Sequence, residues 1–231
     1  MNFYDGFLWY LAFLLSTVIH EASHASVAYK LGDQTAYNTG QVSLNPIPHI
    51  KREPFGTVII PIISFLAAGW MLGWASTPYN LEWANKNPKK AALMAAAGPF
   101  SNFLLVIATA IVIHVGMSLG FFYPPASVNL SSLVASTQSG ILEEIAKLLS
   151  IMFSLNLILL IFNMLPVPPL DGSGLPPLFL NDEMGRNYMS FVRNPAFTFI
   201  GIFVAWNIFD QIYFHIYLFA INLLYPGSYY H

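Results

Sequence analysis

Cysteine is absent from this chain of 231 residues, and charged residues are scarce. Without a thiol no disulfide can form, and any bound zinc ion must be held by imidazole and carboxylate ligands. Charged side chains make up 9% of the sequence and hydrophobic ones 56%, whereas a soluble domain carries about 25% charged residues. The composition therefore excludes an ordinary soluble domain and predicts a polytopic membrane protein.

Long apolar segments account for most of the chain. Each is close to the length of about 20 residues that a helix needs to cross the hydrocarbon core. The segments are residues 7–31, 57–75, 91–119, 141–162 and 196–224. We expect an all-α polytopic membrane protein with about five to six membrane segments, and a single membrane-embedded domain over residues 1–231.

The first apolar segment contains His20, Glu21 and His24 in the pattern HExxH. On a helix, residues four apart share one face, so both imidazoles can bind one Zn²⁺ while Glu21 acts as a general base. Ionisable side chains are costly inside a bilayer, and a membrane helix that carries three of them is expected to be functional. The pattern predicts a metal site within the membrane.

The same segment has a stripe of small and polar residues along one helix face, at Ala12, Ser16, His20, His24 and Ala28. Small residues let neighbouring helices approach closely, so this face is predicted to contact protein. Bulky residues beside the stripe are expected to face lipid: Trp9, Phe13 and Leu14.

Two histidines need at least one further protein ligand for zinc, and an acidic side chain is expected. Asp171 and Asp210 are the candidates. Asp171 lies within a proline-rich break over residues 165–177, and irregular backbone directly after a membrane helix is tolerated where it is buried or lines a cavity. Asp210 belongs to a polar cluster with Asn207 and Gln211 that is expected to face the helix bundle or a water-filled gap.

Three motifs in order resemble the site-2 protease family of intramembrane zinc metalloproteases. HExxH is followed by Gly98-Pro99-Phe100-Ser101-Asn102, similar to the family's GPxxN pattern, and then by NxxPxPxLDG over residues 163–172. The loop Ser43-Leu44-Asn45-Pro46 resembles that of a compact subgroup without a PDZ or CBS domain. The resemblance covers nearly the whole chain.

This resemblance implies a role for each matched position. His20, His24 and Asp171 would bind one Zn²⁺ per chain, and Glu21 would be the catalytic base. Asn163 would contact the substrate or the oxyanion, or would instead cap the broken helix. The expected partners are the lipid bilayer and a single-pass membrane protein or membrane peptide as substrate, with no nucleic acid. The expected location is integral and multi-pass, in the plasma membrane.

Two other classes remain as alternatives. A zinc-binding membrane scaffold without activity would keep the ligands, although Glu21 is intact in this sequence. An ion-coupled transporter would also use broken helices and buried carboxylates. Transporters typically show repeated halves with paired interruptions, a pattern that is not found here.

The topology of the second apolar segment is a separate prediction. If all five segments crossed the membrane, the helix with HExxH and the helix before Asp171 would be antiparallel, whereas in the family they are parallel. Residues 57–75 contain Pro61, Gly69 and Gly73, so we expect this segment to re-enter without crossing. Six basic residues would then share one face, which the positive-inside rule makes cytoplasmic: Lys30, Lys51, Arg52, Lys86, Lys89 and Lys90.

A peptide bond in a membrane helix is protected by internal hydrogen bonds, so its cleavage requires local unwinding. A short irregular or strand-like segment near the active site could pair with the unwound substrate. Residues 69–75 are the candidate, with an ordinary helix end as the alternative reading.

Overall fold

The computed structural model describes residues 3–228 and 230, and most of its regular structure is helical. In chain order the elements are α1 (Phe3–Leu31), α2 (Thr35–Asn38), α3 (Pro46–Arg52), the π-helix η1 (Phe55–Ile59), α4 (Ile60–Ala68), α5 (Leu81–Lys86), α6 (Pro88–Ser118), β1 (Phe122–Tyr123), β2 (Ala135–Ser136), α7 (Ile141–Asn163), the 3-10 helices η2 (Asp171–Gly174) and η3 (Pro176–Leu178), α8 (Asp182–Val192) and α9 (Pro195–Leu224). Two short antiparallel strands, β1 and β2, pair Phe122 with Ser136 in the loop between α6 and α7.

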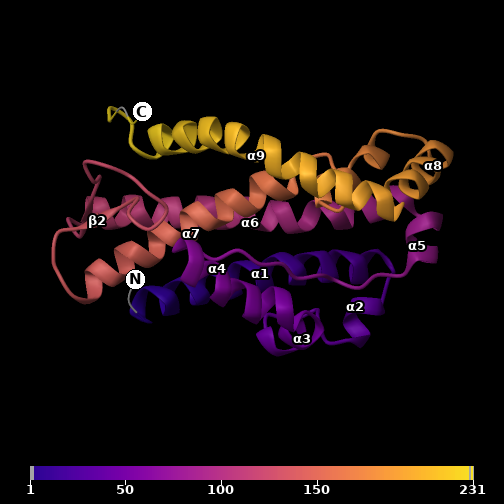
Figure 1. Cartoon of the computed structure of the whole chain (residues 1–231), viewed down its shortest axis with the longest axis horizontal. Helices are drawn as coiled ribbons and strands as arrows, with labels where there is room; N and C mark the ends of the chain where they lie inside the picture. The colour runs from indigo at the N-terminus through magenta and orange to yellow at the C-terminus, as the bar shows by residue number, and fades with distance from the viewer. Residues whose placement is uncertain (1–2, 229, 231) are drawn as a thin grey trace.

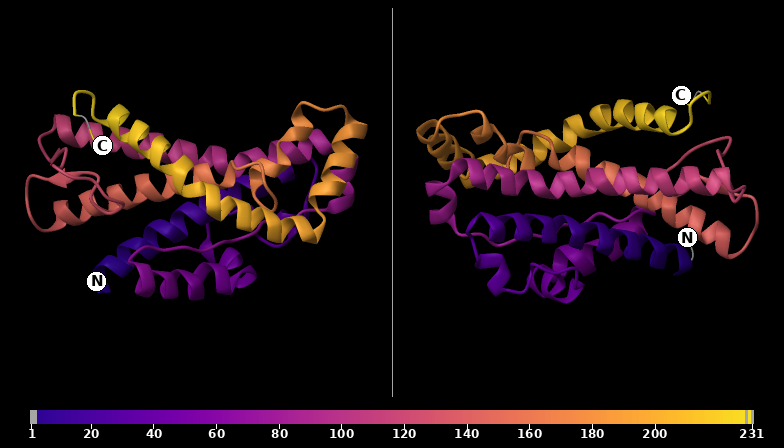
Figure 2. Two further views of the ribbon diagram at one scale, coloured as in Figure 1. Left: turned by 45° about the horizontal axis from the view of Figure 1, so that its top comes forward. Right: turned by 180° about the vertical axis from the view of Figure 1, so that it is seen from behind.

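Among the described residues, four helices are long and apolar enough to span a membrane: α1, α6, α7 and α9. The shortest of them, α7, has 23 residues, and at 1.5 Å per residue it reaches beyond the hydrocarbon core of about 30 Å. Helices α1, α6 and α7 pack side by side, and α9 lies across α7 (Figure 1, Figure 2). The structure thus confirms the predicted all-α, multi-pass membrane protein.

Helix α1 lies in the bundle with its small-residue face inward, as predicted. Ala12, Ser16 and Ala28 are at most 1% exposed. The prediction that Trp9 and Phe13 face lipid was wrong, because both are buried in a cluster with Phe65 and Met71. These partners come from the second apolar segment, which covers a side of α1 that helix periodicity alone assigned to lipid.

The second apolar segment re-enters, as predicted. Together η1 and α4 contain 14 residues, about 21 Å of helix and too little to span the hydrocarbon core. Helix α4 ends at Gly69, whose φ of 79° is left-handed and suits glycine. The chain then returns beside α1 towards α5 as an irregular segment over residues 71–80 (Figure 1).

The chain before and the chain after the re-entrant segment both lie close to the C-terminal end of α1. A carboxylate oxygen of Asp33 accepts a 2.7 Å hydrogen bond from the backbone N–H of Asn80, and Lys90 Nζ, at the start of α6, lies 3.5 Å from the carbonyl of Leu31. At the opposite end, Lys147 near the start of α7 pairs with Asp5 at 2.8 Å. Helices α1 and α7 are therefore parallel, which resolves the topology as the re-entrant prediction required.

Helix α9 packs on the bundle through its small residues. Ala205 is fully buried, and a Cβ added at Gly201 would lie 1.8 Å from the carbonyl oxygen of Pro168. The predicted polar cluster lies elsewhere on this helix, because Asn207, Asp210 and Gln211 are all exposed. The first alternative, that they face the bundle, was wrong, since the small residues determine which side of α9 packs. The second, a water-filled gap, stays a prediction.

Candidate metal centre

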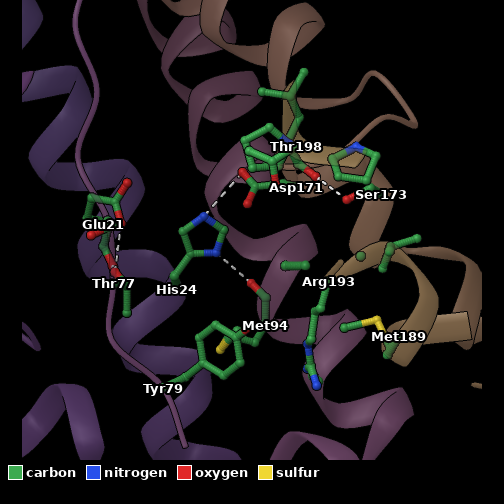
Figure 3. Close-up of a pocket in the computed structure, with 18 of the residues that line it drawn as sticks. Glu21, His24, Thr77, Tyr79, Met94, Asp171, Ser173, Met189, Arg193 and Thr198 are labelled. Atoms are coloured by element: carbon green, nitrogen blue, oxygen red, sulfur yellow. Dashed lines mark hydrogen bonds and ion pairs between the residues drawn. The ribbon is translucent and has the colours of Figure 1, made fainter. Parts of the chain in front are cut away.

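Three predicted ligands converge between α1 and the start of η2. The Nε2 atoms of His20 and His24, one helical turn apart, are separated by 3.0 Å. Oδ2 of Asp171 lies 3.1 Å from Nε2 of His20 and 3.3 Å from Nε2 of His24. Figure 3 shows His24 directed towards Asp171. Among the described residues, these three form the group of His, Asp and Glu side chains that could hold a metal ion.

The donor set and its spacing fit zinc. A tetrahedral Zn²⁺ with bonds of about 2.0–2.1 Å holds its ligand atoms about 3.3 Å apart, and two imidazoles with one carboxylate are a usual catalytic donor set. Gly98 provides the necessary space, because a Cβ at this position would lie 2.3 Å from Nε2 of His24 and 2.5 Å from Nε2 of His20. Only glycine lets α6 pass this close to both imidazoles.

Each imidazole is also held through its other ring nitrogen. Nδ1 of His24 lies 2.7 Å from the backbone carbonyl of Met94, and Nδ1 of His20 lies 2.6 Å from Oδ1 of Asn102. Both partners are on α6. Such outer contacts orient metal-binding histidines and select their tautomer.

Asp171 is the first residue of the short 3-10 helix η2, which packs tightly against the end of α7. Its neighbour Gly172 packs so tightly that a Cβ would lie 2.4 Å from the carbonyl oxygen of Met164, and Ser173 donates a hydrogen bond of 2.7 Å to the carbonyl of Leu170. The Asp171 carboxylate lies within 3.3 Å of both imidazoles, and a carboxyl group binds zinc in its deprotonated form.

Glu21 lines the same cavity as His24 and Asp171, with a volume of about 420 Å³. Glu21 is 5% exposed, and its carboxylate accepts a 2.7 Å hydrogen bond from the hydroxyl of Thr77 (Figure 3). Thr77 belongs to the irregular segment that returns from α4, and Ala75, Ser76 and Tyr79 of that segment also line the cavity. The predicted irregular segment near the active site is present, a few residues beyond the predicted 69–75.

Two other sequence candidates lie away from this centre. Asn163 ends α7 and is partly buried, but it is not among the described residues that line the cavity, so its role stays a prediction. Asp210 lies exposed on α9 and outside the ligand group. The geometry thus favours Asp171 over Asp210 as the third ligand.

Four residues that shape this centre were not assigned a role from the sequence: Thr77, Met94, Gly98 and Asn102. Gly98 and Asn102 belong to the recognised GPxxN motif, which was the available signal. Met94 contributes a backbone carbonyl and Thr77 comes from an irregular segment, so neither leaves a pattern in the sequence.

Comparison with known proteins agrees with this geometry. The chain is 34% identical over 178 residues to "Putative zinc metalloprotease YwhC" of Bacillus subtilis (strain 168), covering 73% of this chain and 71% of that protein. It is 26% identical over 173 residues to "Putative zinc metalloprotease Rip2" of Mycolicibacterium smegmatis, covering 75% of this chain and 57% of that protein.

No solved structure matches the chain. The model of peptidase family M50 matches residues 8–206, and zinc is the metal that the names of both relatives give. Since this match spans most of the sequence and agrees with the resemblance seen in the three motifs, the chain belongs to peptidase family M50, the site-2 protease family of zinc metalloproteases.

Proposed function

We propose that this protein is an intramembrane zinc endopeptidase that hydrolyses a peptide bond in or near the membrane-spanning segment of a single-pass membrane protein or membrane peptide. One observation carries the proposal: His20, His24 and Asp171 converge on one point, and Glu21 lines a cavity together with His24 and Asp171. Both histidines and Glu21 lie on α1, which is long and apolar enough to span a membrane. A hydrolytic site at this depth acts on chains that are themselves in the membrane.

The proposed chemistry divides between the metal and Glu21. Zinc bound by the three ligands supplies Lewis acidity, which polarises a scissile carbonyl and makes water a stronger acid. Glu21 takes the proton from the attacking water and delivers it to the leaving amine nitrogen. Thr77 keeps the Glu21 carboxylate in place by its hydrogen bond. No covalent acyl-enzyme is required.

The substrate must be unwound before cleavage, and residues 75–79 supply a surface for this. Within the described chain their backbone N–H and C=O groups make no hydrogen bonds, whereas Trp74 and Asn80 on either side are bonded to Gly56 and Asp33. An extended substrate could pair with this free backbone and replace the bonds lost from its own helix. This supports a substrate bound as a strand beside Glu21.

The test is cleavage of a model transmembrane substrate by the purified full-length protein with zinc. We expect Glu21→Gln to reduce the rate by about 10²-fold or more while zinc binding is retained. The matched control is Glu82→Gln, because Glu82 is an exposed glutamate on α5 outside the cavity, and it should cleave like the wild type. Equal cleavage by Glu21→Gln would refute the proposed base.

The same assay separates the alternatives. An inactive zinc-binding scaffold would bind zinc and cleave no substrate in the wild type. A transporter would likewise show no zinc-dependent cleavage. Loss of activity with a chelator and its return with added zinc would exclude both classes.

A further inference from the structure

A chain of hydrogen-bonded side chains connects His20 to the core of α7. Oδ1 of Asn102 lies 2.6 Å from Nδ1 of His20, and Nδ2 of Asn102 donates a 2.8 Å hydrogen bond to Oδ1 of Asn156. Nδ2 of Asn156 donates to the backbone carbonyl of Met152 at 2.8 Å and to Oγ of Ser16 at 2.9 Å. Ser16, Asn102 and Asn156 are all 0% exposed, so these bonds do not compete with water.

The backbone carbonyl of Met152 gives this chain of bonds one direction. A carbonyl oxygen can only accept, so the Asn156 group facing it must be the NH₂ group, and its Oδ1 must face Asn102. Asn102 then has to present its own NH₂ group to Asn156, which leaves its Oδ1 for His20. Since that oxygen also only accepts, Nδ1 of His20 must carry the proton, and the lone pair is on Nε2.

We propose that Asn102 and Asn156 form a directional amide relay, a chain of side-chain hydrogen bonds that holds His20 in the Nδ1–H tautomer. The two asparagines are thus positioning residues for zinc binding. The proposal rests on the proposed zinc function of the site. His24 is held in the same tautomer without an intervening amide, because its Nδ1 faces the backbone carbonyl of Met94 directly. Both imidazoles thus have their tautomer set by a backbone carbonyl, one directly and the other through two amides.

The relay also connects three helices, because His20 is on α1, Asn102 on α6 and Asn156 on α7. An asparagine amide that lost its partner on α7 could rotate and present NH₂ to His20. That would favour the opposite tautomer, with the proton on Nε2, where it blocks metal binding. The packing of α7 therefore determines the ligand state of a residue on α1.

The experiment measures zinc affinity of the full-length purified protein by chelator competition, together with the visible spectrum of the Co²⁺-substituted form. We expect Asn102→Leu to weaken zinc binding about 10–100-fold, the usual effect of losing an outer-shell partner. Asn102→Asp should lose less affinity than Asn102→Leu, because its carboxylate still offers an acceptor to Nδ1 although it no longer donates to Asn156. Asn156→Leu should fall between these two.

The matched control is Thr109→Val on α6. Thr109 is buried and bonded only to the carbonyl of Leu105 among the hydrogen bonds of the described residues, so its loss removes a polar group from the same helix without touching the relay. Zinc affinity and the Co²⁺ spectrum of this variant should match the wild type. Its thermal unfolding without metal gives the stability change to subtract from that of the relay variants.

Three results would overturn the relay. These are zinc affinity in Asn102→Leu equal to that of the wild type, equal losses in Asn102→Leu and Asn102→Asp, or a loss in Thr109→Val as large as in Asn102→Leu. If Asn102→Leu does not fold, Asn156→Leu must show the weaker zinc binding, and wild-type affinity there overturns the relay. A wild-type protein that binds no zinc refutes the metal site itself, and so the proposed function as well.

Discussion

At the residue scale, the metal centre depends on how closely α6 approaches α1. Gly98 lies against both imidazoles, and the Met94 carbonyl and Asn102 lie one turn to either side of it on the same helix. Interior packing is dense enough that one added methyl group must displace its neighbours. For a methyl group added at Gly98, these neighbours are the predicted metal ligands His20 and His24.

Gly98→Ala is expected to abolish or strongly weaken zinc binding, because the new methyl group would push both Nε2 atoms out of position. Gly116→Ala is the control on the same helix, since its Cβ would meet the ring of Phe122 instead. That variant should lower the thermal unfolding temperature and leave zinc affinity unchanged. Metal content after purification, measured beside thermal unfolding, checks both. Full zinc occupancy in Gly98→Ala would contradict the packing argument.

Thr77→Val is expected to reduce cleavage about 10–100-fold, as the loss of a hydrogen bond to a charged group of about 1.5–3 kcal/mol implies, with zinc content unchanged. The reason is that Glu21 loses the hydroxyl that fixes its carboxylate. Thr77→Ser keeps the hydroxyl and should retain most of the activity. The cleavage rate at saturating substrate is the measurement. Equal cleavage rates for the valine and serine variants would show that Thr77 does not position Glu21.

How much of this centre the sequence predicts depends on the kind of group involved. The HExxH spacing predicts that His20 and His24 share a face, and the proline-rich break identifies Asp171, because helix geometry and broken backbone leave local patterns. Thr77 and the Met94 carbonyl depend on which segments lie beside α1 in space. Since one position is on an irregular segment and the other contributes only backbone, no local pattern predicts them.

At the element scale, the carboxylate of Asp33 ties the chain after the re-entrant segment to the end of α1. Asp33 is buried and accepts hydrogen bonds from the Thr35 hydroxyl at 2.6 Å, the Thr35 backbone N–H at 2.9 Å and the Asn80 backbone N–H at 2.7 Å. Burial by itself would raise the pKa of Asp33, but these hydrogen bonds outweigh it and lower the pKa. This link in turn places residues 75–79 along the cavity.

A lowered pKa in the folded state means that the stabilisation by Asp33 is complete above the usual carboxyl value and is lost as the pH falls through the folded-state value. We therefore expect the segment around Asn80 to loosen only in acid, between about pH 4 and lower values. Pepsin cleavage of this segment across that range measures the effect. At neutral pH, where pepsin is inactive, thermolysin should cleave this segment in Asp33→Asn but not in Asp182→Asn, which lies at the exposed start of α8. Equal resistance in both variants would contradict the role of Asp33.

The free backbone of residues 75–79 gives a second prediction at this scale. Proline at Ala75 or at Ser76, introduced one at a time, removes one N–H group from the proposed strand edge. Cleavage should fall markedly in at least one of the two variants without loss of zinc, because successive N–H groups of an extended chain point to opposite sides. Ala75→Val and Ser76→Ala keep the N–H groups and serve as controls. Wild-type cleavage by both proline variants would exclude pairing at this edge.

Helix and segment predictions succeeded where length and composition decide the outcome. The re-entrant segment follows from its two glycines and from the parallel helices that the family requires, and Gly69 does end α4. The burial of Trp9 and Phe13 was missed because it depends on where that segment folds back. The exposed side of α9 was missed for the same kind of reason, since the contact of Gly201 with Pro168 selects the packed face.

At the scale of the whole molecule, the basic residues are distributed very unevenly. The chain has nine Lys and Arg residues. Lys147 lies at the end of the helix bundle where α7 begins. The other eight lie in helix ends and connecting segments on the side of the bundle where α1 stops. We call this the basic end. By the positive-inside rule it is predicted to face the cytoplasm.

Single cysteines report this orientation directly, because the natural chain contains none. Asn38→Cys and Glu82→Cys, on exposed positions at the two sides of the re-entrant segment, should react with an impermeant maleimide only from the cytoplasmic side. Ser139→Cys, exposed in the loop before α7, should react only from the other side. Labelling of Glu82→Cys from the side opposite to Asn38→Cys, with Ser139→Cys labelled from the same side as Asn38→Cys, would mean that the second apolar segment crosses the bilayer.

The depth of the ligands along α1 has a consequence for what would leave the enzyme. His24 lies seven residues before the helix end at Leu31, about 10 Å from the basic end, whereas about 25 Å of helix precede His20. A transmembrane substrate cleaved at the level of these ligands would give two fragments with apolar segments of unequal length. The fragment towards the basic end would retain too few apolar residues to stay anchored and could escape into the aqueous phase, while the other fragment would remain in lipid.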